Sequence, residues 1–70
     1  MTDPAPSDIA YRRLHRSGWT IGDTALAKRP GLVWCVYGHN GENVIRAEGR
    51  TRDEAWAAAV DQARAVGMLS

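Results

Sequence analysis

The sequence predicts an α+β domain with the element order α-β-β-β-α: a short helix, a three-stranded antiparallel meander and a long C-terminal helix. Three observations predict this class. Two β-rich runs flank Asn40-Gly41, a strong hairpin signal. Arg29-Pro30-Gly31 marks an earlier turn, and an alanine-rich segment with helix-capping residues closes the chain. Seventy residues make one domain, with 1–7 expected as a disordered lead-in and 8–70 as the folded part.

The first expected element is a helix over 8–16. Ser7-Asp8 can cap it, and Asp8 would lie at the positive end of the helix dipole. Its basic residues gather toward the other end: Arg12, Arg13, His15 and Arg16. Gly18 follows as a terminator. A helix of two to three turns does not persist alone in water, so its apolar face must dock on the rest of the chain.

Three strands are expected over 19–27, 32–38 and 43–49, with Gly22-Asp23 interrupting the first as a bulge or a break. A turn centred on Asn40-Gly41 places Val36 opposite Ile45 and Trp34 opposite Ala47 on one face. The other face then carries the pairs Tyr37 with Val44, Cys35 with Arg46 and Val33 with Glu48. The second strand is therefore apolar on both faces.

The last element is a helix over 51–66. Thr51 and Glu54 form a capping box at its start, and Gly67 is well placed to end it in the left-handed conformation. The alanines favour helix and allow close approach to a sheet. The buried stripe is expected to consist of Trp56, Ala59, Val60, Ala63 and Val66.

Composition excludes several classes of protein. Cys35 is the only cysteine, so no disulfide forms within the chain, which suits a reducing compartment. The longest apolar run, 32–37, is far below the roughly 18–20 residues that span a bilayer. Residues 1–7 lack the basic and apolar regions of a signal peptide. We therefore expect a cytoplasmic protein with no membrane partner.

The start of the last helix resembles that of double-stranded-RNA-binding domains, which share the α-β-β-β-α order. That family carries a Gly, a Ser or Thr cap and a Lys-Lys-x-Ala-Lys-x-x-Ala-Ala run, and the matching positions here are Gly49, Thr51, Ala55, Ala58 and Ala59. The resemblance implies the family's fold. Of the three family lysines that face phosphates, Arg52 keeps the charge, while Asp53 and Trp56 replace the others. Arg29-Pro30-Gly31 stands where the family has Gly-Pro-x-His. The pattern is also similar to small uncharacterised bacterial proteins with Gly-Trp-Thr, Gly-Glu-Asn-x-Ile and Thr-x-x-Glu-Ala-Trp segments.

No constellation of residues predicts catalysis, a cofactor, a metal or a small-molecule substrate. Cys35 and His39 are the only neighbouring soft ligands, and a zinc site needs four. Four residues along an extended strand also keep them beyond hydrogen-bond reach, so they do not form a nucleophile pair. We expect a protein that is not an enzyme.

The favoured function is a protein–protein interaction, with another protein or a second copy, through the sheet face away from the C-terminal helix. Its residues are Val33, Cys35, Tyr37, Val44 and Arg46. An exposed apolar cluster edged by arginine is typical of interfaces. The opposite outcome, in which the 8–16 helix folds over this face and buries it, remains open.

Two alternatives accompany this hypothesis. One is nucleic-acid binding, because residues 8–29 hold five basic and two acidic side chains, a net charge of +3. The candidate contacts are Arg12, Arg13, Arg16, Lys28, Arg29 and Arg52. The other is a small phage- or plasmid-type inhibitor of a host protein, which the length of the chain suits.

Overall fold

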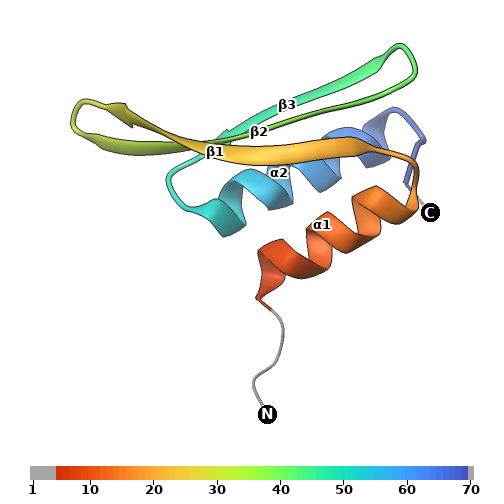
Figure 1. Ribbon diagram of the computed structural model, residues 1–70, viewed down its shortest axis with the longest axis horizontal. Helices are drawn as coiled ribbons and strands as arrows, with labels where there is room; N and C mark the ends of the chain where they lie inside the picture. The colour runs from red at the N-terminus through yellow and green to blue at the C-terminus, as the bar shows by residue number, and fades with distance from the viewer. Residues whose placement is uncertain (1–4, 70) are drawn as a thin grey trace.

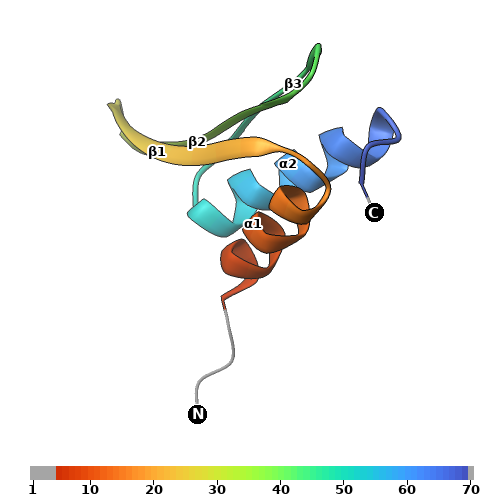
Figure 2. The ribbon, with the colours of Figure 1, turned by 45° about the vertical axis from the view of Figure 1, so that its right-hand side comes forward.

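The computed structural model describes residues 5–69 and has the expected order of elements. They are α1 (Pro6–Arg16), β1 (Thr20–Lys28), β2 (Gly31–Asn40), β3 (Asn43–Gly49) and α2 (Arg52–Ala65). The strands form one antiparallel sheet in the order β1-β2-β3. Both helices lie against the same face of it, so the molecule has one sheet layer and one helical layer (Figures 1 and 2).

The core fills the space between the two layers. Leu14 from α1, Val36 and Ile45 from the sheet and Trp56 from α2 are essentially inaccessible. Small residues of α2, Ala55, Ala59 and Ala63, are also fully buried. Because α2 presents alanines to the strands, it packs closely on β3 and β2, while α1 packs on α2 and β1. The expected core position of Trp56 is confirmed; Trp34 is half-buried at its margin.

Both helices end in the same hydrogen-bonded motif. Gly67 has a φ of 73°, its N–H donates to Arg64 O (3.0 Å), and Met68 N–H donates to Ala63 O (3.0 Å). Gly18 has a φ of 96° and plays the same part after α1, where Trp19 N–H donates to Leu14 O (3.1 Å). Two such bonds around a left-handed glycine define the Schellman motif. The sequence-based expectation for both glycines is confirmed.

The start of α1 differs from the expectation. The helix begins at Pro6, and no side chain caps it, so the predicted Ser7-Asp8 cap is wrong. Proline suits the first helical position because its missing N–H would have no partner there. The Ser7 N–H instead donates to Asp53 Oδ1 of α2 (3.1 Å), which ties the two helix starts together. Pro6 and Ser7 of the expected lead-in are thus helical, and residues 1–4 lie outside the described part.

The β2–β3 hairpin has the predicted faces in a different register. The two-residue loop is Gly41-Glu42, closed by Asn40 opposite Asn43, so pairing is displaced by two positions and Tyr37 faces Arg46 instead of Val44. Gly41 has a φ of 61° and Asn40 does not have positive φ. The Asn40 side chain is engaged elsewhere, since its Nδ2 donates to Ser17 O (3.1 Å). A displacement of two leaves every side chain on its predicted face.

β1 is continuous, so the expected bulge or break at Gly22-Asp23 is wrong; these residues pair with Tyr37 and Val36 without interruption. Trp19 lies just before the strand, fully buried, and its Nε1 donates to Met68 O (2.9 Å). The β1–β2 hairpin turns at Arg29-Pro30 and extends past the start of α2 (Figure 1).

Candidate protein-interaction surface

The sheet face opposite the helices, here called the outer face, carries all five residues predicted for the interface. Pleating brings Val33, Cys35 and Tyr37 of β2 to this face, beside Val44 and Arg46 of β3. No helix of the described chain covers it (Figure 2). Tyr37 is 53% exposed and Val44 54%, whereas Val33 and Cys35 are half-buried between the flanking strands.

Tyr37 and Arg46 form the centre of the outer face. They are directly opposite in the β2–β3 ladder, and the Arg46 guanidinium carbon lies 5.8 Å from the centroid of the Tyr37 ring. A guanidinium within about 6 Å of a ring face is attracted by its quadrupole, by about 0.5–1 kcal/mol at an exposed site. The pair therefore orders two large side chains that sequence reasoning had placed in different rungs of the ladder.

Leu26 also belongs to the outer face, and the sequence-based selection missed it. It faces Val33 across the β1–β2 ladder and is 48% exposed. The missed signal was the alternation of the first strand, in which Thr20, Gly22, Thr24 and Leu26 share a face once no bulge interrupts it. Leu26, Val33, Tyr37 and Val44 thus extend the apolar surface across all three strands.

A charged cluster lies on the other, helix-facing side of the sheet. Asp23 Oδ2 accepts from Arg52 Nε (2.6 Å) and from the buried Trp56 Nε1 (2.8 Å). Partial burial opposes ionisation of Asp23, but the hydrogen bonds from Arg52 and Trp56 and the Arg52 charge hold its pKa below the ordinary 3.8. The same hydrogen bond raises the pKa of Arg52. The cluster is structural, because it clamps β1 to the start of α2.

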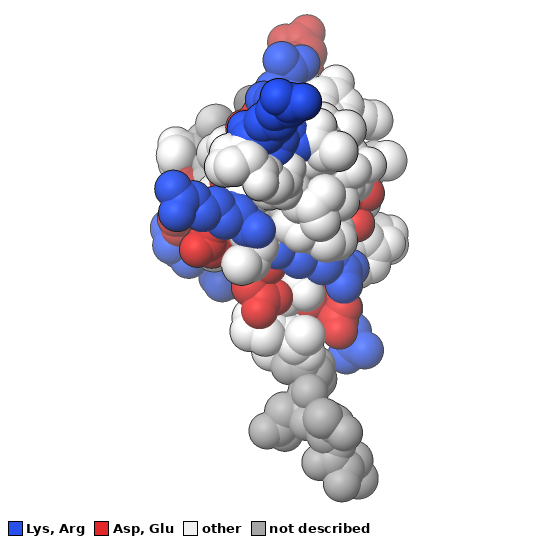
Figure 3. Space-filling view, turned by 90° about the vertical axis from the view of Figure 1, so that its left-hand side faces the viewer, with Lys and Arg blue, Asp and Glu red and all other residues white. Residues whose placement is uncertain are grey.

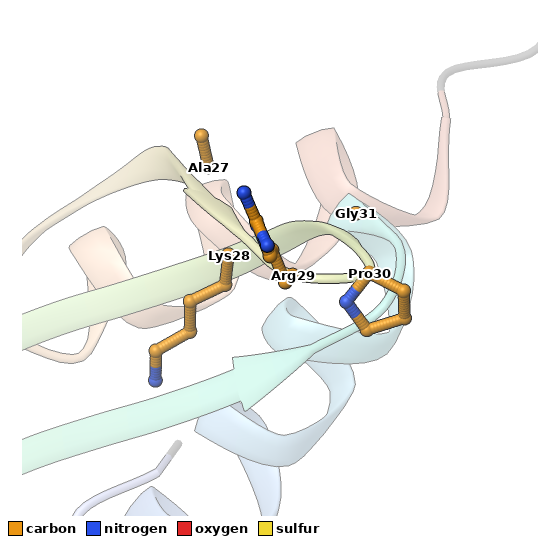
Figure 4. Close-up of a pocket in the computed structure, with 5 residues that line it drawn as sticks. All are labelled: Ala27, Lys28, Arg29, Pro30 and Gly31. Carbon is orange, nitrogen blue, oxygen red and sulfur yellow. The ribbon is translucent and has the colours of Figure 1, made fainter.

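The six basic residues proposed for nucleic-acid binding do not form one patch. Arg52 is paired with Asp23, and Arg16 lines a depression with 67–69 at the end of the molecule away from the β1–β2 turn. Lys28 and Arg29 lie at that turn and point in different directions (Figure 4). Figure 3, which looks onto the end with this turn, shows Lys and Arg in separate groups, with uncharged residues and, lower down, Asp and Glu between them.

Cys35 and His39 stand on the same strand, four residues apart, which corresponds to roughly 13 Å along β2. Within residues 5–69 no three His, Cys, Asp or Glu side chains come together as metal ligands do. None of the described helices has the length and apolar character needed to cross a membrane.

Comparisons of the chain with protein-family models, with curated proteins and with solved structures found no match. The fold and the outer face therefore carry the functional argument.

Proposed function

We propose that the protein is a non-catalytic interaction module that pairs with a second copy of itself through the outer face. The observation that supports this most is the position of α1. Because it joins α2 in one helical layer, the described chain leaves Tyr37 and Val44 without cover. Half-exposed apolar side chains scattered singly are normal on proteins, but four on one continuous sheet face are typical of an interface.

The charges of the outer face favour a second copy as the partner. Arg46 and Glu48 are two positions apart on β3 and point to the same face. In a two-fold interface the same surface meets itself, so each residue contact occurs twice. Pairing of two outer faces lets Arg46 of one copy meet Glu48 of the other on both sides of the axis. Such rim pairs set the orientation more than they set the affinity.

The area of the outer face determines how tightly two copies are expected to bind. Three strands at a spacing of about 4.8 Å and seven paired residues at about 3.3 Å give a footprint of roughly 14 by 23 Å. This is about 320 Å² per copy or about 650 Å² in total, well below the roughly 1,200–2,000 Å² of stable interfaces, so self-pairing is weak and transient. We therefore expect a dimer with a dissociation constant of hundreds of micromolar.

Sedimentation velocity over about 5–500 μM protein tests the proposal. The wild-type chain is expected to shift from monomer to dimer in this range, and Tyr37→Glu to remain monomeric, because it places a charge at the centre of the interface. Ile9→Glu is the matched control: Ile9 is 54% exposed on α1, outside the outer face. A chain that stays monomeric throughout, or dimers abolished equally by Ile9→Glu, would refute self-pairing.

Nucleic-acid binding is a second candidate. The α-β-β-β-α order that the chain shares with double-stranded-RNA-binding domains supports it, as does a depression at the hairpin tip lined by Lys28, Arg29 and Arg50. Three to five phosphate contacts predict a slope of about −3 to −4.5 for log affinity against log salt on duplex DNA. Titration of duplex RNA, duplex DNA and single strands at low salt tests it, and no binding to any of them would exclude this function.

A further inference from the structure

The two edge strands of the sheet, β1 and β3, differ in whether another part of the chain bonds their outward main-chain groups. The edge of β3 is occupied by the side chain of Gln62 from α2: Arg46 N–H donates to Gln62 Oε1 (3.0 Å), and Gln62 Nε2 donates to Arg46 O (2.8 Å). These are the two bonds that a residue of an added strand would make with Arg46. Gln62 therefore closes the middle of the β3 edge, one of the ways in which proteins prevent unwanted strand pairing.

The geometry of the turns shows which groups of β1 point outward. In a hairpin with a two-residue loop, the closing pair is hydrogen-bonded and alternate residues then turn N–H and C=O away from the partner strand. Applied to the loop closed by Asn40 and Asn43, this rule makes Arg46 outward-facing, as the Gln62 bonds confirm. Applied to the loop closed by Lys28 and Gly31, it makes Ala25 and Ala27 outward-facing.

Within the part of the chain that the structure describes, no side chain bonds the edge of β1 over its second half in this way. Residues 24–28 are all exposed, and within residues 5–69 no hydrogen bond outside the sheet reaches the main chain of Ala25 or Ala27. The segment has no proline and no bulge, and the small side chains of both alanines leave room for another backbone. This is the form of edge that accepts an added strand.

The charge around this edge indicates what kind of strand fits. Lys28 and Arg29 stand at the turn where this edge ends, and they line one depression together with Arg50, which follows β3. Asp23, the acidic residue of β1, is already paired with Arg52. The end of the edge at the β1–β2 turn is thus net positive.

We propose that Thr24–Lys28 of β1 is a docking edge for an extended acidic segment of another protein, which adds to the sheet as a fourth strand. Main-chain bonds to Ala25 and Ala27 hold the segment, and its carboxylates face Lys28, Arg29 and Arg50 at the turn. This goes beyond the proposed function, since it uses a different surface and a different partner from the outer face.

A fluorescent seven-residue peptide, Asp-Val-Glu-Val-Asp-Val-Glu, tests the proposal, with its Lys-substituted counterpart and an N-methylated version as peptide controls. NMR amide spectra are expected to shift at 24–28, and hydrogen exchange at Ala25 and Ala27 to slow about tenfold at saturating peptide. Binding is expected to weaken severalfold between 50 and 500 mM salt, because the charged contacts are exposed. The Lys peptide and the N-methylated peptide are expected not to bind.

Two variants locate the site. Ala25→Pro removes an outward N–H without touching the bonds to β2, which an edge position tolerates, and is expected to weaken peptide binding about tenfold or more. Gln62→Ala opens the other edge and is expected to leave peptide binding at β1 unchanged. Circular dichroism tests whether both variants are folded. If Ala25→Pro unfolds, the N-methylated peptide still tests main-chain pairing on the wild-type protein.

Three results would overturn the proposal. One is unchanged exchange at Ala25 and Ala27 with millimolar acidic peptide, and another is equal binding of the Lys peptide. The third is protection of the two amides that rises with protein concentration alone, since this would assign the edge to a second copy. Tyr37→Glu, which tests the outer face, is expected to bind the peptide like wild type, so failure of one proposal is distinguishable from failure of the other.

Discussion

Gly49→Ala tests how closely α2 approaches the end of β3. A β-carbon at Gly49 would stand 2.5 Å from the Ala55 nitrogen and 2.8 Å from Glu54 Cβ. The nearest atom is main chain of the first turn of α2 and cannot rotate away. The helix must therefore retreat until the contact reaches about 3.4 Å, the beginning of ordinary van der Waals separation.

The expected cost follows from overpacking. Forcing an extra carbon into a tight contact typically destabilises by about 1–3 kcal/mol. A domain of 70 residues has about 4–10 kcal/mol of total stability, so the substitution removes a substantial part of it. With about 4–8 °C per kcal/mol for a domain of this size, the melting temperature is expected to fall by roughly 5–20 °C.

Gly22→Ala is the matched control. A β-carbon at Gly22 meets nothing within 4 Å, and its φ is not positive. There the added methyl group restricts the unfolded chain and is expected to stabilise by about 0.4–1 kcal/mol. Urea unfolding followed by tryptophan fluorescence and far-ultraviolet circular dichroism measures both. An unfolding midpoint for Gly49→Ala equal to or above that of the wild type would refute the close approach of α2.

Two further predictions concern single hydrogen-bonded groups. The pKa of Asp23 is lower in the folded than in the unfolded protein, where it is near 3.8. Its carboxylate therefore stabilises the fold fully above this unfolded value, and the stabilisation is lost as the pH falls through the lower folded value. Asp23→Asn is expected to be less stable than wild type in urea titrations at pH 7, and the difference in stability is expected to narrow toward pH 2. Thr51→Ala removes the acceptor for Glu54 N–H (3.1 Å) and is expected to cost about 1 kcal/mol in the same assay; no loss would show that the cap contributes nothing.

Local signals in the sequence predicted most of the secondary structure. Thr51 caps α2 as expected; the return bond of Glu54 goes to Arg50 N–H (2.9 Å) instead of the cap residue's own N–H. β3 has the predicted bounds, and Gly18 and Gly67 end their helices. These features depend on contacts between residues that are close in the chain, so a short segment of sequence contains every residue that makes the contact.

The wrong predictions of local structure concern residues that form hydrogen bonds with partners far away in the sequence. Asn40 was expected within a two-residue turn, but its side chain bonds Ser17 of the α1–β1 connection. Ser7 was expected as a cap, but its N–H bonds Asp53 at the other end of the chain. Gly22-Asp23 was expected to break β1, but Asp23 is held in register by Arg52 and Trp56. None of these partners is near its acceptor or donor in the sequence.

The faces of the candidate site were readable from the chain alone, because strand side chains alternate with a period of two and a two-residue slip preserves every face. Tertiary packing decided the rest: that α1 lies beside α2 and leaves the outer face bare, and that Gln62 closes one sheet edge while the other stays open. Both features depend on how elements far apart in the sequence pack against one another. Hydrophobic pattern and local propensity do not specify this packing.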